Sequence, residues 1–313
     1  MTLAADPAAA PPRPLTPGAT LVAAFLARRS RRKLLVVSNC QTFGIVNCMQ
    51  HIGAGVEADG LTVHEAAGKS DAFYADLLGR YDHVFTVGHL RAQVENPAYA
   101  GRMSYLPTIY FPCYHPDLIY ASHRGIGLDS PLGGYHSAIA LACFLRGLSV
   151  ADTVRMFNAK TYAAIGYFDG WDQSRDRLFA GFRSLGYPRL EDAFYRWCAE
   201  GCFMVSINHP RIRVLHSIAA EALRYIGIPV ERRYAEVADN MLNGPIYPVY
   251  PEVGECYGVQ GDYRFKLPGT NYTLGLEEFV ALNFESYREL TPEAVTLDSP
   301  YREKVAAITR LLA

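Results

Sequence analysis

Residues 33–52 read KLLVVSNCQTFGIVNCMQHI. Residues 33–37 form a short apolar, partly β-branched run that stops at Ser38 and Asn39, which predicts a buried strand. Over residues 42–52 the apolar side chains recur at helical spacing, which predicts a helix. A strand, a tight polar turn and a helix are typical of the opening of a doubly wound sheet.

The pattern continues through the first third of the chain and then changes. We expect strands at 61–64, 83–87 and 104–111, with a helix at 71–78. After Gly133, helices are expected at 135–146, 150–157, 173–181, 190–200 and 211–225, a late strand at 203–207, irregular chain over 243–272 and two terminal helices. The sequence therefore predicts an α/β fold with a parallel, Rossmann-like sheet core and a large helical portion.

The expected domain organisation is simple. Residues 1–17 are rich in Ala and Pro, which predicts a disordered N-terminal tail. Residues 18–313 are predicted to form a single α/β domain with a helical insertion around 135–200.

The composition is typical of a globular protein and excludes some partners. Half of the residues are hydrophobic and 19% are charged, and the formal net charge is -1. This balance gives no global attraction to nucleic acid or to anionic membranes, so an anion site would need a local cluster of Arg and Lys. No apolar run approaches the ~20 residues that a transmembrane helix requires.

The cysteines indicate a reduced environment. They are odd in number and scattered, mostly within apolar runs: Cys40, Cys48, Cys113, Cys143, Cys198, Cys202 and Cys256. Such usage is typical of cytoplasmic thiols rather than of a disulfide framework, so we place the protein in the cytoplasm. There is no Cys-x-x-Cys or His-Glu-x-x-His motif, so no metal site is expected.

The first candidate site is the turn Ser38-Asn39-Cys40-Gln41. Ligands of open α/β sheets bind at the carboxyl ends of the strands, where this turn is expected. A thiol at a helix N-terminus is stabilised as thiolate, which would make Cys40 a nucleophile. The amides of Asn39 and Gln41 and nearby backbone N–H groups could hold an oxyanion. The alternative is that Cys40 is a buried apolar residue and Asn39 only caps the helix.

Two histidines are candidate bases. His115 follows the expected fourth strand in Tyr114-His115-Pro116-Asp117, where Asp117 is close enough in sequence to orient it. His209, in Ser206-Ile207-Asn208-His209-Pro210-Arg211, could act on a hydroxyl group or on Cys40. A structural role for a histidine beside a proline is the alternative.

A glycine-rich stretch from residue 125 to 134 leads into Tyr135-His136-Ser137 at an expected helix N-terminus. It matches neither the P-loop nor the dinucleotide fingerprint, yet it could cradle a phosphate. Ser137 as an ordinary N-cap is the alternative. The cationic residues near these segments are Arg124, Lys160, Arg211 and Arg213. We assign the first three to an anionic cofactor, and the alternative is that these side chains are simply solvated.

Taken together, these segments resemble the WcbI-type polysaccharide biosynthesis proteins. The resemblance rests on Ser38–Gln41, Tyr114–Asp117, the stretch from Ser130 through Ser137 with Arg146–Ser149, and Asn208–Pro210, so it spans roughly residues 33–225. It implies a coenzyme A-binding, capsule-associated acetyltransferase with a core related to SGNH-type esterases. In that analogy Cys40 takes the place of the nucleophilic serine and His209 that of the late base.

The resemblance implies acetyl transfer from acetyl-CoA to a sugar hydroxyl of capsular polysaccharide, with capsule assembly proteins as possible partners. Two alternatives remain open. One is an SGNH-like esterase or deacylase that uses Cys40 without coenzyme A, and the other is a non-enzymatic glycan- or nucleotide-binding module. The sugar, the direct or acetyl-cysteine route, and the oligomeric state do not follow from the sequence.

Overall fold

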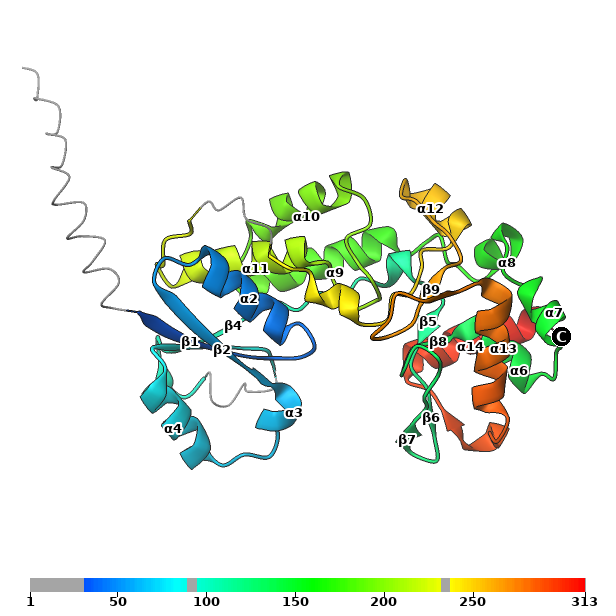
Figure 1. The fold of residues 1–313 in the computed structure, drawn as a ribbon, viewed down its shortest axis with the longest axis horizontal. Helices are drawn as coiled ribbons and strands as arrows, with labels where there is room; N and C mark the ends of the chain where they lie inside the picture. The colour runs from blue at the N-terminus through cyan, green and yellow to red at the C-terminus, as the bar shows by residue number, and fades with distance from the viewer. Residues whose placement is uncertain (1–30, 89–94, 232–236, 313) are drawn as a thin grey trace, which may run out of the picture.

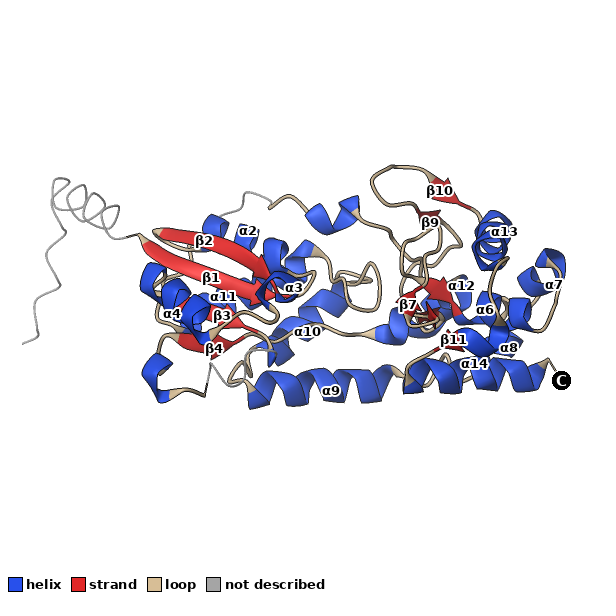
Figure 2. Ribbon diagram, turned by 90° about the horizontal axis from the view of Figure 1, so that it is seen from below, coloured by secondary structure: helices blue, strands red, loops and turns tan. Residues whose placement is uncertain are grey.

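The computed structural model describes residues 31–88, 95–231 and 237–312 (Figure 1). The N-terminal tail predicted at residues 1–17 lies outside these residues. The described part of the chain is an α/β structure in which a parallel sheet lies at one end of an elongated molecule and a helical portion extends to the other end (Figures 1 and 2). The predicted α/β class and the large helical portion are therefore confirmed.

The central sheet has four strands in the order β2-β1-β3-β4, all parallel. The strands are β1 (Arg32–Ser38), β2 (Val56–Thr62), β3 (His83–Thr86) and β4 (Met103–Tyr105). Because β2 and β3 flank β1 on opposite sides, the strand order reverses between β1 and β3. The carboxyl ends of these two strands therefore form the kind of crevice in which open sheets bind ligands.

Both faces of this sheet are covered. Leu34 and Val36 belong to the same buried cluster as the helix α2 (Thr42–Ile52), which packs against α11 (Ile212–Tyr225). Leu35 and Val37 instead join the cluster that includes α4 (Asp71–Arg80), on the opposite face (Figure 1). A strand buried on both faces is apolar throughout, which explains why residues 33–37 show no alternation.

The helical portion is built from helices of five to fourteen residues and from small sheets of two or three strands. After α3 (Val63–Ala66), the further α-helices are α6 (Ala138–Leu145), α7 (Val150–Val154), α8 (Ala159–Ala164), α9 (Trp171–Ser184), α10 (Leu190–Ala199), α12 (Pro251–Tyr257), α13 (Leu276–Tyr287) and α14 (Ser299–Leu311). The short strands are β5 (Leu118–Ile119), β6 (Ser122–His123), β7 (Ile126–Gly127), β8 (His136–Ser137), β9 (Phe265–Lys266), β10 (Thr273–Leu274) and β11 (Val295–Thr296). Figure 1 shows α9 and α10 beside α11, whereas α6, α7, α13 and α14 gather at the far end.

One buried cluster runs through both ends of the molecule. It includes Leu34 of the sheet and Ile308 of the last helix. Six of its largest fully buried side chains are tyrosines: Tyr114, Tyr162, Tyr187, Tyr247, Tyr250 and Tyr287. This continuity is consistent with the predicted single domain, which stays a prediction. Within the described ranges, no helix is long and apolar enough to cross a membrane.

Two predicted strands in the first third differ from the structure. The strand predicted at 61–64 is β2, which begins at Val56 and ends at Thr62, because Thr62 and Glu65 form a capping box that starts α3. The strand predicted at 104–111 pairs only as far as Tyr105, and the rest continues as extended chain. Pro107 and Pro112 lack the N–H that ladder pairing requires.

The late strand predicted at 203–207 is wrong. Only an isolated bridge joins Met204 to Pro210, and residues 204–210 form a tight loop closed by the Val205 N–H, which donates to the His209 carbonyl at 2.8 Å. The run is apolar because the loop is buried against other segments, not because it pairs in a sheet: the Phe111 N–H donates to the Ile207 carbonyl at 2.8 Å.

Candidate functional site

The predicted turn lies between β1 and α2. The Asn39 Oδ1 accepts the Gln41 backbone N–H at 3.0 Å, and the Asn39 carbonyl accepts the Thr42 hydroxyl at 2.7 Å. These bonds fix the shape of the turn, while Cys40 remains exposed. Among the described residues, no acceptor binds the Asn39 amide nitrogen, so its N–H groups are available to a ligand.

The Gln41 side chain is a structural clamp. Its Nε2 donates to the carbonyl oxygens of Ile109 and Asn208, both at 2.9 Å, and its Oε1 accepts the Ile109 N–H at 3.3 Å. Both amide hydrogens are therefore used, and the predicted oxyanion role of Gln41 has no N–H left to serve it. Ser38, from the same turn, is buried, and its hydroxyl has no partner within the described ranges.

His209 lies in a cluster of polar side chains. Its Nδ1 contacts the Tyr135 hydroxyl, the Ser206 Oγ at 3.0 Å and the Asn208 Oδ1 at 2.9 Å. The Asn208 Nδ2 lies 3.0 Å from the Tyr120 hydroxyl, and the Asn208 Oδ1 faces the His209 Nδ1. In this orientation the amide oxygen accepts from the neutral imidazole tautomer that carries its proton on Nδ1 and its lone pair on Nε2.

Cys40 lies beside the loop that carries this cluster. Its Sγ is 3.9 Å from the backbone oxygen of Asn208. Burial of the thiol among its neighbours raises the pKa of Cys40 to about 11, although the residue keeps exposed surface. The expected thiolate is therefore wrong for the free protein, in which the thiol is protonated at neutral pH. Burial also lowers the pKa of His209, so its imidazole is neutral and able to accept a proton.

Tyr135 belongs to this cluster and not to a phosphate cradle. Its hydroxyl contacts His209 and accepts from the Ser206 hydroxyl at 3.1 Å. Burial raises the pKa of Tyr135 to about 12, so the phenol stays protonated. Tyr120 packs edge-on against Tyr135, with ring centroids 5.6 Å apart. Burial raises the pKa of both phenols, and the neighbouring Cys40 raises it further.

His115 and Asp117 are buried apart from this cluster. The His115 Nδ1 donates to the Pro248 carbonyl at 3.2 Å, and burial lowers the pKa of His115 to about 4. Asp117 accepts the hydroxyls of Tyr167 at 2.6 Å and Tyr250 at 2.7 Å, among other donors. Within the described ranges His115 and Asp117 share no hydrogen bond, so the predicted orienting pair does not form.

His136 and Ser137 have structural partners. The His136 Nδ1 contacts the Tyr287 hydroxyl at 2.8 Å, and its Nε2 contacts the Leu128 carbonyl at 3.1 Å. Ser137 is the N-cap of α6, since its Oγ accepts the Ala140 N–H at 2.9 Å. Both residues are fully buried, so neither side chain can reach a phosphate group in this structure.

The cationic residues assigned to the cofactor are dispersed. Arg124 lies at the turn between β6 and β7, in a left-handed backbone conformation with φ 54°. Lys160 is exposed on α8, at the end of the molecule far from the parallel sheet (Figure 1). Arg211 directly precedes α11, and its Nε donates to the Cys202 carbonyl at 3.1 Å. The structure does not bring the three together.

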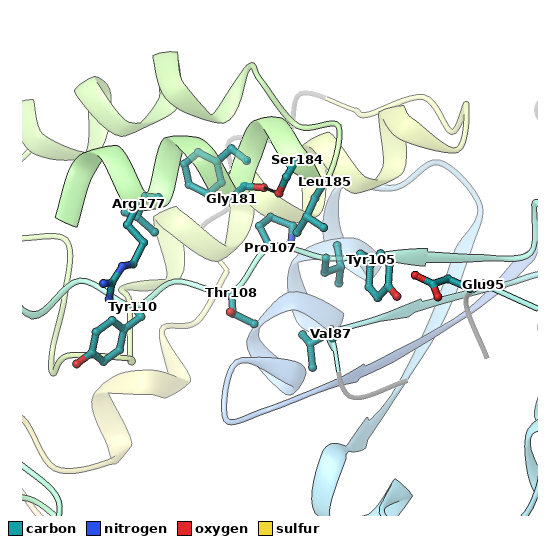
Figure 3. Close-up of a pocket in the computed structure, with 14 residues that line it drawn as sticks. Val87, Glu95, Tyr105, Pro107, Thr108, Tyr110, Arg177, Gly181, Ser184 and Leu185 are labelled. Atoms are coloured by element: carbon teal, nitrogen blue, oxygen red, sulfur yellow. Dashed lines mark hydrogen bonds between the residues drawn. The ribbon is translucent and has the colours of Figure 1, made fainter. Parts of the chain in front are cut away.

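A cavity of about 710 Å³ lies at the carboxyl ends of β3 and β4. It is lined by Val87 after β3, by the chain that follows β4, and by Arg177 and neighbouring residues of α9 (Figure 3). No residue of the turn 38–41 lines it, but Thr108 and Tyr110 of its lining flank Ile109, the residue whose carbonyl binds the Gln41 amide. The cavity is therefore connected to the Cys40 turn through the Gln41 side chain.

Sequence reasoning missed part of this arrangement. Asn208 and Ser206 belong to the sequence motif of His209, but the motif alone indicates no role for them. Nothing in the sequence distinguishes Tyr120 from the other tyrosines, of which the chain has 21 in all. No group of three His, Cys, Asp or Glu residues that could hold a metal ion occurs within the described ranges.

The fold and site define an α/β protein with a cysteine–histidine site at the carboxyl edge of a parallel sheet. The model of the WcbI polysaccharide biosynthesis enzymes matches residues 33–231, so the chain belongs to this family. This confirms the resemblance inferred from the sequence.

A solved structure is similar in fold. It covers 90% of this chain and 95% of its own, with a TM-score of 0.56 and 13% sequence identity. That protein is described as WcbI, a polysaccharide biosynthesis enzyme, in a native form without a disulfide bond between coenzyme A and one of its cysteines. No curated protein matches the chain.

Proposed function

We propose that this protein is an acetyl-CoA-dependent O-acetyltransferase that acts on a sugar hydroxyl in capsular polysaccharide biosynthesis. The observation that carries the proposal is the His209 imidazole, which is neutral and holds its proton on Nδ1 beside the Cys40 turn. The family supplies the polysaccharide context, and the description of the similar structure names coenzyme A. Kinship of the core with SGNH-type esterases is part of the proposal.

In the proposed reaction His209 is the general base. Its Nε2 takes the proton of the acceptor hydroxyl as the sugar oxygen attacks the thioester carbonyl. The tetrahedral intermediate collapses with cleavage of the C–S bond, and the departing coenzyme A sulfur receives the proton from Nε2. Asn208 keeps the imidazole in the required tautomer through its Oδ1, in the position where an acid commonly stands.

Asn39 is the side chain that stabilises the oxyanion of the tetrahedral intermediate in this mechanism. Its amide nitrogen is available, whereas the hydrogens of Gln41 are occupied. Gln41 contributes by holding the turn against residues 109 and 208, so its role is to position the site.

Cys40 lines the reaction centre as a neutral thiol in the direct route. With a pKa of about 11 the thiol is a poor nucleophile until a base removes its proton. An acetyl-cysteine route would need His209 to deprotonate Cys40 first and the acceptor hydroxyl second. We favour direct transfer because it uses the base once.

The cavity at the carboxyl ends of β3 and β4 is proposed to receive the acceptor. Tyr110 offers an amphipathic ring and Arg177 a fixed set of donors, a combination suited to an oxygen-rich ligand (Figure 3). A cytoplasmic location and contacts with capsule assembly proteins complete the proposal. The seven free cysteines support a reducing compartment.

The test is acetyl-CoA binding by calorimetry together with release of coenzyme A in the presence of capsule oligosaccharides and nucleotide sugars. We expect His209→Asn to lower turnover by about 10²–10⁴-fold while donor affinity changes little. His216→Asn, a half-buried histidine of α11, is the matched control and should keep full turnover. Cys40→Ala should keep measurable transfer in the direct route, and intact mass should show no acetylated wild-type protein.

Two outcomes would reject the proposal. A folded protein that binds neither coenzyme A nor acetyl-CoA is not this transferase. Ester cleavage that needs Cys40 and no coenzyme A would instead favour the esterase.

A further inference from the structure

A second cavity, of about 600 Å³, lies at the base of the His209 loop. Its lining comes from His115, from the segment 200–213 that joins α10 to α11, and from residues 246–249 and 260–264, which flank α12 in the sequence. Three guanidinium groups contribute to the lining, those of Arg211, Arg213 and Arg264. No residue of this cavity lines the one at the carboxyl ends of β3 and β4.

The positive charges of this cavity are incompletely balanced. Glu200 pairs with Arg213 at 3.3 Å, and the Asp262 Oδ1 accepts the Arg264 backbone N–H at 2.9 Å. Arg211 bonds to a carbonyl oxygen, and within the described ranges neither it nor the exposed Arg264 has an acidic partner. Three guanidinium groups thus face two carboxylates, both already engaged.

Arg211 and Arg213 also repel each other. Burial lowers the pKa of Arg213, the Glu200 carboxylate opposes this, and the neighbouring Arg211 lowers it further. Like charges held together at a partly buried site destabilise the empty protein, and a bound anion removes that cost.

A buried histidine also lines this cavity. His115 is 2% exposed, and its Nδ1 donates to the Pro248 carbonyl. Its Nε2 is buried and has no hydrogen-bond partner within the described ranges. Burial lowers the pKa of His115 to about 4, so the imidazole is neutral and adds no charge to the cavity. The cavity therefore offers guanidinium donors for an anion.

We propose that this cavity is a phosphate-binding site for a phosphorylated sugar or nucleotide. Guanidinium groups bind phosphate oxygens through paired, charge-assisted hydrogen bonds, which fits Arg211 and Arg264. The volume, about 600 Å³, leaves room beyond a phosphate group for an attached ring. This assignment stands whether or not the protein transfers acetyl groups.

The site is connected to the catalytic candidate through the loop 204–210. Met204 of the cavity lining pairs with Pro210 in an isolated bridge, and the Val205 N–H donates to the His209 carbonyl. The same short loop thus carries His209 near its end and borders the phosphate site at its base. A ligand bound at this cavity therefore contacts the segment that positions His209.

The experiment measures binding of inorganic phosphate, uridine diphosphate and adenosine 3′,5′-bisphosphate to the full chain by calorimetry. We expect at least one probe to bind, and Arg264→Gln and Arg211→Gln each to weaken it about tenfold. Arg288→Gln removes an exposed arginine that pairs with Glu285 on α13 and should leave binding unchanged. Circular dichroism of each variant confirms folding, and Arg264, being exposed, is the safest to replace.

The arms separate the two sources of phosphate. If Arg264→Gln weakens adenosine 3′,5′-bisphosphate and coenzyme A together, the site holds the nucleotide end of the donor. If it weakens uridine diphosphate alone, the site holds a phosphorylated acceptor. Either result supports the phosphate site, and it should persist in Cys40→Ala. The proposal is overturned if no probe binds the folded wild type, or if both arginine variants bind as well as Arg288→Gln does.

Discussion

The parallel-sheet region and the region around Asp117 are stabilised in different ways. In the first, backbone pairing of β1 with its neighbours is sandwiched between two apolar clusters. In the second, a single fully buried carboxylate collects the hydroxyls of Tyr167, Tyr247 and Tyr250 and a backbone N–H at the start of α6. Many small contributions support the sheet, whereas the Asp117 region concentrates its polar bonding on one residue. The difference predicts unequal tolerance of substitution.

The largest expected effect is that of Asp117→Ala. It leaves three buried tyrosine hydroxyls and one backbone N–H without their acceptor. It also removes the negative charge that favours protonation of the half-buried Lys304, whose pKa burial already lowers to about 8. We expect the free energy of unfolding to fall by about 3–5 kcal/mol, measured by urea titration.

The matched change in the sheet region is Asp59→Ala. This exposed carboxylate accepts one tyrosine hydroxyl, that of Tyr81, at 2.9 Å. Its loss should cost less than about 1 kcal/mol. Equal losses for the two variants would show that the regions are not stabilised differently.

A smaller effect is expected at the connection between the sheet and the rest of the chain. Gln41→Leu leaves the carbonyls of Ile109 and Asn208 and one N–H unpaired in a buried place. The free energy of unfolding should fall by about 2–3 kcal/mol, and turnover should fall with it because the Cys40 turn loses its support.

The control is Gln50→Leu on α2. Gln50 also donates its amide to a carbonyl, that of Ala58 at 2.6 Å, but its side chain is exposed. We expect little change in either thermal stability or turnover. If Gln41→Leu had the same melting temperature and turnover as Gln50→Leu, the Gln41 side chain would not hold the Cys40 turn in place.

The smallest effect is in the pH dependence, where we expect the two regions to agree. Burial lowers the pKa from 6.5 to about 4 both for His83 in the sheet and for His115 near Asp117. Below pH 6.5 the unfolded chain takes up these protons and the folded protein does not. Stability is therefore complete above pH 6.5 and declines as the pH falls toward 4. Between pH 7.5 and 5.5, each histidine should lower the free energy of unfolding by about 1 kcal/mol.

Urea titrations of His83→Gln and His115→Gln at the two pH values measure this. Each variant should lose less stability on acidification than the wild type, by a similar amount. If a variant keeps the pH dependence of the wild type, the histidine that it replaces has the same pKa in the folded and unfolded protein.

The sequence predicted the sheet region well because periodicity determines it. Three elements appear at nearly the expected bounds: the strands at 33–37 and 83–87 and the helix at 71–78. Their apolar residues pack into the two buried clusters that cover the faces of the parallel sheet. The run 203–207 has the same apolar character but forms a loop, because its backbone groups bond to distant segments such as Phe111 and Tyr247. Local pattern cannot distinguish burial in a loop from burial in a strand.

The same contrast holds for the candidate site. Cys40 and His209 were predicted because strand ends and a turn beside proline mark positions where side chains are displayed. The bond of Gln41 to the Asn208 carbonyl joins residues 167 positions apart, and the contact of Tyr135 with His209 joins residues 74 positions apart. Nothing within a local window reports such partners, and Asp117 bonds to tyrosines rather than to the adjacent His115 for the same reason.

The long sequence separation between Gln41 and its partner Asn208 also determines when the site can form during synthesis. A growing chain that has passed Tyr105 holds all four strands of the parallel sheet, yet its Gln41 still lacks the partner that emerges 167 residues after it. The cysteine turn and the histidine loop are completed together, late in translation. Chains that end before residue 208 therefore lack one of the two carbonyls that hold Gln41, and in the proposed mechanism they carry Cys40 without its base.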